Sequence, residues 1–264
     1  MINVGVFGAG GRMGVEVCRT VVADPALRLV AAIDPLKAGI DLRQATGIDR
    51  VSLQLSAGPD ALAEGKAHVA VDFTHHGAAM DNLRWCAANG VHAVVGTTGF
   101  SADDLAELTA AFTKSNCVIA PNFAIGAVLM MRFAEMAAPY FETAEIIEFH
   151  HDAKIDAPSG TAMATVARMA AAKAAASAEW APDPTEKELL PGARGGEGPS
   201  GIRVHAVRMR GMVAHQEVIL GTTGQTLVVR HDTTDRTSFM PGVVLAVKRI
   251  ADHPGLTVGL DALL

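Results

Sequence analysis

The fold of this chain is decided by the stretch Ile2-Asn3-Val4-Gly5-Val6-Phe7-Gly8-Ala9-Gly10-Gly11-Arg12-Met13-Gly14. A strand-like apolar run leads into a glycine-rich turn, and helical spacing of apolar residues follows from 13 to 22. Glycines lack a Cβ, so the chain can turn sharply and bring backbone N–H groups against a pyrophosphate at the positive end of a helix dipole. The stretch predicts a dinucleotide-binding turn whose candidate contacts are Gly8, Ala9, Gly10, Gly11, Arg12, Met13 and Gly14.

The spacing departs from the strict dinucleotide fingerprint, since Met13 stands where the third glycine of G-x-G-x-x-G belongs. A plain tight turn therefore stays open as an alternative. Asp34 favours the cofactor, because it follows Gly14 by 20 residues at the end of the next apolar run, where a carboxylate accepts bonds from ribose hydroxyls. A carboxylate favours NADH, whereas Arg12 and Lys37 offer partners to the 2′-phosphate of NADPH, so the preference stays open.

Outward from this turn, short apolar runs alternate with helical patterns up to about residue 120, which is typical of βαβ units and a parallel sheet. The expected strands are 4–7, 29–33, 69–73, 93–95 and 118–119, and the expected helices are 13–22, 78–89 and 102–113. The prediction is an α/β, Rossmann-like parallel-sheet domain.

Two further loops follow expected strands. One carries Gly96, Thr97 and Thr98, and the other reads Ala120-Pro121-Asn122-Phe123. In open α/β sheets ligands lie at the carboxyl ends of the strands, so both loops are placed to border the nicotinamide half of a cofactor. Ordinary βα turns are the alternative.

After Asn122 the pattern predicts a smaller α+β domain with a second, mixed sheet. The expected strands are 145–149, 203–210, 217–220 and 226–231, with a hairpin across 221–224. An alanine-rich helix is expected over 161–179, a mobile surface loop over 182–201 and a final apolar helix over 243–251.

The densest polar chemistry lies between Glu148 and Thr161. His150 and His151 are adjacent, Lys154 follows, and Ser159-Gly160-Thr161 opens a helix. A helix start, a hydroxyl and an ammonium group together suit a small dianion, and histidine can donate a proton near neutral pH. The alternatives are a metal pair or plain polar residues at a strand end. We expect no metal, because adjacent residues of an extended chain face opposite sides and no third ligand has a characteristic spacing.

Composition narrows the class of protein. The net charge is −6 and half of the 264 residues are apolar, which favours a folded chain and disfavours a nucleic-acid partner. We expect no membrane partner, because the longest apolar run, 123–131, falls short of the roughly 20 residues that a spanning helix needs. Three cysteines without short spacing and the lack of a secretory leader favour a cytoplasmic protein with core cysteines.

Five motifs in order resemble the 4-hydroxy-tetrahydrodipicolinate (dihydrodipicolinate) reductases of bacterial lysine and diaminopimelate biosynthesis. They are GAGGRMG at 8–14, DFT at 72–74, GTTGF at 96–100, APNFAIG at 120–126 and HHDAKIDAPSGTA at 150–162. The stretch HAVRMRGMVAHQEV at 205–218 adds to the resemblance, which spans nearly the whole chain. The family often has another histidine before the lysine, and Ala153 stands there in this chain.

This resemblance implies a dinucleotide-binding domain over 1–121 and 233–264, and a substrate and tetramerisation domain over 122–232. It implies His150 as catalytic acid, Lys154 as second proton donor, and His151, Gly160 and Thr161 as holders of the substrate carboxylates. NADH or NADPH would supply a hydride to a cyclic imine dicarboxylate, with hinges near Asn122 and Thr233 and a homotetramer as the assembly.

Two other functions remain open from the sequence. A different two-domain oxidoreductase, acting on an amino-acid semialdehyde or a polyol, would share the first domain and bring its own catalytic set. A non-catalytic dinucleotide sensor would bind NADH without consuming it.

Overall fold

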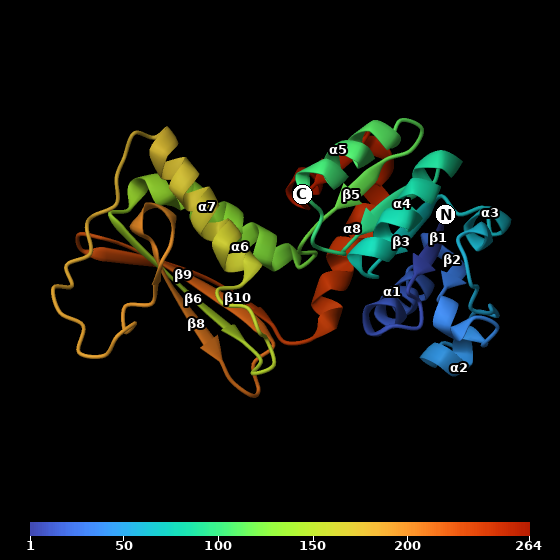
Figure 1. Ribbon diagram of the computed structural model, residues 1–264, viewed down its shortest axis with the longest axis horizontal. Coiled ribbons are helices and arrows are strands. Elements are labelled where there is room, and N and C mark those ends of the chain that lie inside the picture. The colour runs from blue at the N-terminus through green and yellow to red at the C-terminus, as the bar shows by residue number, and fades with distance from the viewer. The chain divides into compact units, whose positions relative to one another are not determined.

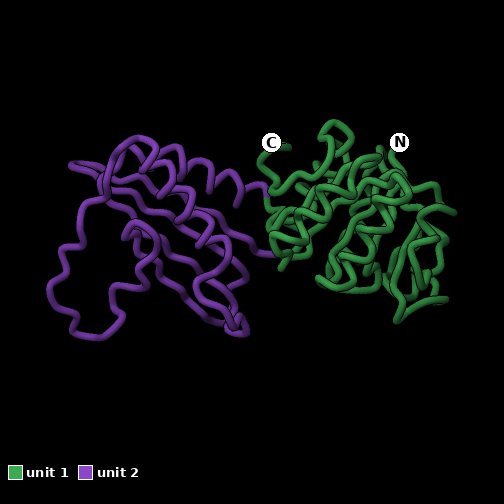
Figure 2. The backbone as a smooth tube through the Cα atoms, turned by 45° about the horizontal axis from the view of Figure 1, so that its top comes forward, with its two compact units in different colours: residues 1–124, 236–264 green, residues 125–235 purple.

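A computed structural model describes all 264 residues, and the chain forms two compact units, shown in green and purple in Figure 2. Unit 1 comprises residues 1–124 and 236–264, and unit 2 comprises residues 125–235. Each boundary lies three residues beyond the one expected from the sequence. Unit 2 is therefore inserted into the chain of unit 1.

Unit 1 is built on a six-stranded sheet with the order β11-β5-β4-β3-β1-β2, and every pair of neighbouring strands is parallel (Figure 1). The predicted α/β class with a Rossmann-like sheet is confirmed. Its strands are β1 (Ile2–Phe7), β2 (Leu27–Ile33), β3 (Val69–Asp72), β4 (His92–Val95), β5 (Cys117–Ile119) and β11 (Leu256–Val258). Its helices are α1 (Arg12–Ala23), α2 (Leu42–Thr46), α3 (Asp60–Glu64), α4 (His76–Asn89), α5 (Ala102–Ala111) and α8 (Met240–Arg249).

Helices cover both faces of this sheet, which explains why its central strands are apolar throughout. Strand residues such as Phe7 and Val95 form one core cluster with Leu83 of α4 and Leu108 of α5. Alternate strand residues, such as Val71, point to the opposite face, where α1 and α8 pack against each other. The burial of both faces fixes the register of the strands.

The strand register brings the loops that carry the predicted cofactor residues of unit 1 to one edge of its sheet. Phe7 pairs with both Ile33 and Asp72, Asp72 pairs with Val95, and Val95 pairs with Ile119. The segments that begin at residues 8, 34, 73, 96 and 120 therefore leave the sheet at the same carboxyl edge. Strands β2 and β3 lie on opposite sides of β1, so the chain changes direction between β1 and β3, where open α/β sheets bind ligands.

Unit 2 carries a five-stranded sheet with the order β10-β9-β6-β8-β7. The sheet is mixed, as the sequence predicted, and β7 adds a fifth strand to the four expected ones. Strands β6 and β8 are parallel, while β9 runs antiparallel to β6 and to β10. The strands are β6 (Thr143–His150), β7 (Gly196–Glu197), β8 (Arg203–Arg208), β9 (Ala214–Thr222) and β10 (Gln225–Thr233). The hairpin between β9 and β10 turns at Thr223 and Gly224, inside the predicted turn.

One face of this sheet packs against α6 (Ile125–Ala137) and α7 (Gly160–Ala175), which lie together in Figure 1. The residues buried under the helices follow the two-residue period of the strands: Ile146 and Glu148 on β6, and Gln216, Val218 and Leu220 on β9. A glutamate and a glutamine on an otherwise apolar face need polar partners.

Several elements differ from the sequence predictions. Helix α6 was not predicted, and neither was the three-residue strand β11, which pairs with β5. The segment 182–201, expected to be a mobile loop, contains β7, and Arg194 within it forms ion pairs with Glu145 and Asp183. The alanine-rich helix ends at residue 175 rather than 179, and β8 ends at 208 rather than 210.

None of the helices combines the length and the apolar content that crossing a lipid bilayer requires.

Candidate active site

The glycine turn after β1 is packed so tightly that side chains would break it. Gly8 has a φ of +65°, a left-handed conformation that favours glycine. A Cβ on Gly14 would lie 2.0 Å from the Gly8 carbonyl oxygen, so only glycine lets α1 start this close to the turn. Gly11 precedes α1 as its N-cap without a side-chain cap, and its N–H donates to Gly8. The turn fits a pyrophosphate, because it presents a bare helix start at the switch point.

Asp34 lies beside this turn, as the sequence spacing predicted. It is 9% exposed, and its carboxylate accepts from the backbone N–H of Gly10 at 3.1 Å and of Leu36 at 3.2 Å. Lys37 reaches the same place, since its Nζ donates to the Gly10 carbonyl oxygen at 2.6 Å. A carboxylate and an ammonium group therefore lie together where the ribose of a dinucleotide is expected.

The loops after β3 and β4 are tied together by a buried carboxylate. Asp72, 1% exposed, accepts from the backbone N–H of Thr74 at 2.8 Å, from its hydroxyl at 2.6 Å and from the amide of Asn82 at 2.7 Å. The Thr97 hydroxyl donates to the same carboxylate at 3.3 Å. A Cβ on Gly96 would overlap the ring of Phe73. These contacts hold Gly96 and Thr97 at the carboxyl edge, while Thr98 is exposed.

The loop after β5 continues this edge. Ala120 and Phe123 are buried, Pro121 is exposed, and the Asn122 side chain accepts from the backbone N–H of Ala124 at 2.9 Å. The ring of Phe123 packs on that of Phe73 with centroids 5.7 Å apart. The loops after β3 and β5 therefore meet, and the fold brings the predicted cofactor residues to one edge of one unit.

The polar cluster of unit 2 is built around His150, the last residue of β6. Its Nδ1 lies 2.5 Å from Oε2 of Glu148, whose side chain is fully buried. Burial is the main cause that lowers the pKa of His150, and the Glu148 carboxylate offsets part of this effect. Lys154 and Arg208 lower the pKa of His150 further through their charges.

Arg208, at the end of β8, pairs with Glu148 in the fork geometry typical of guanidinium and carboxylate groups. Its two terminal nitrogens lie 2.8 Å from the two carboxylate oxygens of Glu148, and one of them also donates to the Asp156 carbonyl oxygen at 2.6 Å. Burial raises the pKa of Glu148, but hydrogen bonds from Arg208 and His150 outweigh it, so the net pKa lies below the usual value. Glu148 is therefore ionised at neutral pH.

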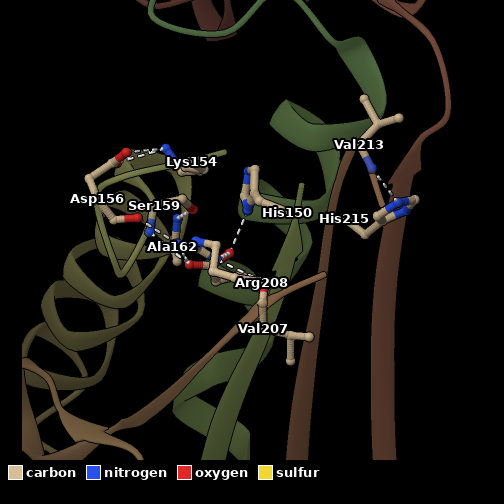
Figure 3. Close-up of polar contacts among 10 residues, drawn as sticks. His150, Lys154, Asp156, Ser159, Ala162, Val207, Arg208, Val213 and His215 are labelled. Atoms are coloured by element: carbon tan, nitrogen blue, oxygen red, sulfur yellow. Dashed lines mark hydrogen bonds and ion pairs between the residues drawn. The ribbon is translucent and has the colours of Figure 1, made fainter. Parts of the chain in front are cut away.

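Lys154 and His151 lie outside this buried cluster. The Nζ of Lys154 is 2.7 Å from both carboxylate oxygens of Asp156, toward which it turns in Figure 3. His151 follows β6 and is exposed. His150 and His151 thus differ in environment, as the alternation of an extended chain predicted.

Gly160 and Thr161 open helix α7, as predicted. Ser159 is the N-cap residue, and its hydroxyl accepts from the backbone N–H of Ala162 at 3.2 Å. The space where a Cβ of Gly160 would stand is open to 4 Å. A 16-residue helix that begins at an open position suits one carboxylate of a small ligand.

No three His, Cys, Asp or Glu side chains are grouped as ligands for a metal ion. The cysteines are free and buried, and burial raises the pKa of Cys18 and of Cys86 to about 12. They are core residues, as predicted.

Comparison with known proteins identifies the family. The family model described as "Dihydrodipicolinate reductase, N-terminus" matches residues 2–123, and the one described as "Dihydrodipicolinate reductase, C-terminus" matches residues 126–264. This chain belongs to the dihydrodipicolinate reductase family. The resemblance read from the five sequence motifs is confirmed.

Relatives of the dihydrodipicolinate reductase family match the chain over its whole length. The 4-hydroxy-tetrahydrodipicolinate reductase of Thermobifida fusca is 53% identical over 100% of this chain and 99% of its own. That of Corynebacterium urealyticum is 48% identical over the same shares. A solved dipicolinate-bound dihydrodipicolinate reductase from Paenisporosarcina sp. TG-14 is 39% identical, covers 100% of both chains and has a TM-score of 0.87.

Sequence reasoning gave no role to three residues of this candidate site: Glu148, Arg208 and Asp72. A signal for Glu148 was present, because it stands two residues before His150 on one strand and therefore shares its face. Arg208 gave no such signal, because its position beside His150 depends on the pairing of β6 with β8. Asp72 lay within a quoted motif without a role.

Proposed function

We propose that this chain catalyses the reduction of the cyclic imine dicarboxylate formed from 4-hydroxy-tetrahydrodipicolinate to tetrahydrodipicolinate, in diaminopimelate and lysine biosynthesis. The observation that carries the proposal is full-length similarity to 4-hydroxy-tetrahydrodipicolinate reductases, 53% and 48% identical, over a chain that holds the polar cluster at His150. The pyridine nucleotide, when bound, supplies the hydride.

Unit 1 would hold the nucleotide at the carboxyl edge of its sheet. The glycine turn would bind the pyrophosphate through backbone N–H groups, and Asp34 would bind the ribose. Thr97, Thr98 and the loop 120–123 would border the nicotinamide. Because Asp34 and Lys37 lie together, we propose that both NADH and NADPH are accepted, the carboxylate serving the ribose hydroxyls and the ammonium group serving the 2′-phosphate.

Unit 2 would hold the dicarboxylate. One carboxylate of the substrate would bind at the start of α7, at Gly160 and Thr161, with His151 as a further partner. His150 would provide a proton to the ring as negative charge develops on it. Lys154 would act as the second donor after exchanging Asp156 for the substrate. Binding of a dianion favours the charged form of a nearby histidine, which supports this role for a group with a lowered pKa.

The test follows consumption of reduced nicotinamide by its absorbance, with substrate generated enzymatically. We expect turnover with both nucleotides. His150→Ala and Lys154→Ala are each expected to lose about 10²-fold or more in kcat while nucleotide affinity, measured by fluorescence titration, stays near the wild-type value. Full turnover in both variants would remove the site assignment. Binding of NADH without its consumption would favour the sensor.

We propose that the assembly is a homotetramer in the cytoplasm, with unit 2 as the contact. Strand β10 lies at an edge of the unit 2 sheet, and Leu227 and Val228 on it are 38% and 50% exposed. Exposed apolar edge strands invite pairing with another chain. Light scattering coupled to size exclusion tests this assembly, and a monomeric mass would refute it.

A further inference from the structure

We propose that Glu148, held by Arg208, is a positioning residue that orients both His150 and the start of helix α7. This inference rests on the proposed function, because it takes His150 as the proton donor and the start of α7 as the seat of a substrate carboxylate. It adds two residues that neither motif spacing nor the family resemblance assigned.

The Glu148 carboxylate has four donors around it, and together they satisfy both oxygens. Oε1 accepts from the backbone N–H of Ser159 at 3.0 Å and from Arg208 at 2.8 Å. Oε2 accepts from the other terminal nitrogen of Arg208 at 2.8 Å and faces Nδ1 of His150 at 2.5 Å. One buried group thus connects the acid, the helix start and a cation.

Strand geometry explains why these groups meet. Glu148 and His150 are two residues apart on β6, so their side chains leave the same face. The β6–β8 register places Arg208 directly beside His150, and Arg208 reaches back to Glu148 diagonally. Ser159 comes from the segment after β6, which Arg208 also holds through the Asp156 carbonyl oxygen.

The contact sets the proton arrangement on His150. An ionised carboxylate only accepts hydrogen bonds, so Nδ1 of His150 carries the hydrogen that faces Glu148. Nε2 is then the ring nitrogen that exchanges a proton with a ligand. The charges that act on His150 are the carboxylate of Glu148 and the cations of Lys154 and Arg208. Without Glu148, burial and two cations would all oppose protonation of the ring.

The same carboxylate fixes the start of α7. Ser159 is bound from both sides, because its N–H donates to Glu148 while its hydroxyl accepts from Ala162. Ser159 is 4% exposed, so this cap is part of the buried structure. Movement of Glu148 would therefore displace His150 and the position of Gly160 together.

A purely structural ion pair is the competing explanation, since removing one member of a buried pair destabilises a protein. The chain offers a matched control in Glu145, three residues earlier on β6. Glu145 lies 2.6 Å from Arg194 and 2.6 Å from His205, so it also joins an arginine and a histidine. It contacts neither His150 nor Ser159.

The experiment compares Glu148→Gln with Glu145→Gln in the full chain. Nitrogen-15 NMR of labelled histidines reports the tautomer and titration of His150, and steady-state kinetics report kcat and KM. For Glu148→Gln we expect loss of the Nδ1–H tautomer, a basic limb of the kcat profile moved to lower pH, and a loss of about 10- to 100-fold in kcat. The KM for the nucleotide should stay within about twofold of wild type, and Glu145→Gln should match wild type throughout.

The double variant Glu148→Gln with Arg208→Gln guards against misfolding, because removing both charges leaves no lone buried ion. It should show the same His150 tautomer change as Glu148→Gln at a thermal midpoint nearer to wild type. An unchanged tautomer and titration of His150 in folded Glu148→Gln would overturn the proposal, as would an equal change in Glu145→Gln. Failure of the proposed function would look different, since wild type would then reduce no imine while the NMR result stood.

Discussion

Replacing Gly14 with alanine tests whether the turn after β1 is shaped by backbone contact and binds the nucleotide. An alanine Cβ there would lie 2.0 Å from the Gly8 carbonyl oxygen and 2.8 Å from the Cα of Ala9. Ordinary van der Waals contact begins at 3.4 Å, so the turn and the helix must separate by about 1.4 Å. Both overlapping partners are backbone atoms, and no side chain can rotate away.

The expected cost follows from this overlap. Forcing an extra methyl group into a packed site costs about 1–3 kcal/mol, so the free energy of unfolding of Gly14→Ala should fall by that amount. Gly77 is the matched control, because it also lies in the first turn of a helix, and the atoms nearest to its Cβ position are 3.9 Å away. Alanine is favoured over glycine in a helix by up to about 1 kcal/mol, so the free energies of unfolding of the two variants should differ by about 1–4 kcal/mol.

Urea unfolding followed by circular dichroism measures this difference. Gly14→Ala should also weaken NADH binding, because displacement of the turn removes at least one charge-assisted hydrogen bond to the pyrophosphate. Fluorescence titration with NADH measures this loss of affinity. Such a bond contributes about 1.5–3 kcal/mol, which is about 10- to 100-fold in Kd. Stability within about 0.5 kcal/mol of wild type, together with unchanged NADH affinity, would refute the reasoning.

Three further predictions concern the nucleotide, pH and thiols. Asp34→Asn should weaken the binding of NADH more than that of NADPH, because it removes the carboxylate and leaves Lys37. The KM values for the two nucleotides check this prediction, and an equal change in both would contradict it. Burial is the main cause that lowers the pKa of His92 and of His231, so the folded state binds fewer protons than the unfolded state. Their contribution to stability is present above pH 6.5, the ordinary histidine value, and is lost as pH falls through the lowered pKa of each. Urea midpoints should therefore drop as pH falls below 6.5, and a flat profile there would be inconsistent with this reasoning. Buried cysteines whose pKa lies at about 12, as for Cys18, should resist a thiol reagent in native protein and react after unfolding, whereas rapid native labelling would show that these side chains are accessible.

The sequence predicted unit 1 well because parallel strands buried on both faces are apolar runs, and the glycines mark the turn that follows β1. It missed α6 because the first part of this helix lies in the apolar run 123–131, where no polar residues mark a helical period. It missed β11 because three residues carry no period, and their pairing with β5 is set by tertiary structure.

For the candidate site, the sequence identified what lies close along the chain and missed what the sheet brings together. His150, Gly160 and Thr161 share one segment and were readable as a cluster. The fork between Glu148 and Arg208 spans 60 residues and arises only from the β6–β8 register. Asp34 was readable because its distance from Gly14 reflects the length of one βαβ step, whereas its bond to the Gly10 N–H was not.

Because residues 125–235 are inserted into unit 1, unit 2 links the two chain segments of unit 1. The two ends of unit 2 lie close together within its own fold, since Gly126 lies against the ring of His231. While unit 2 is folded, unit 1 does not have to close a flexible loop of 111 residues (235 − 124) when it folds. If unit 2 alone unfolded, the entropy of loop closure would destabilise unit 1 by on the order of 4 kcal/mol. Damage to the sheet around His150 should therefore lower the thermal stability of unit 1.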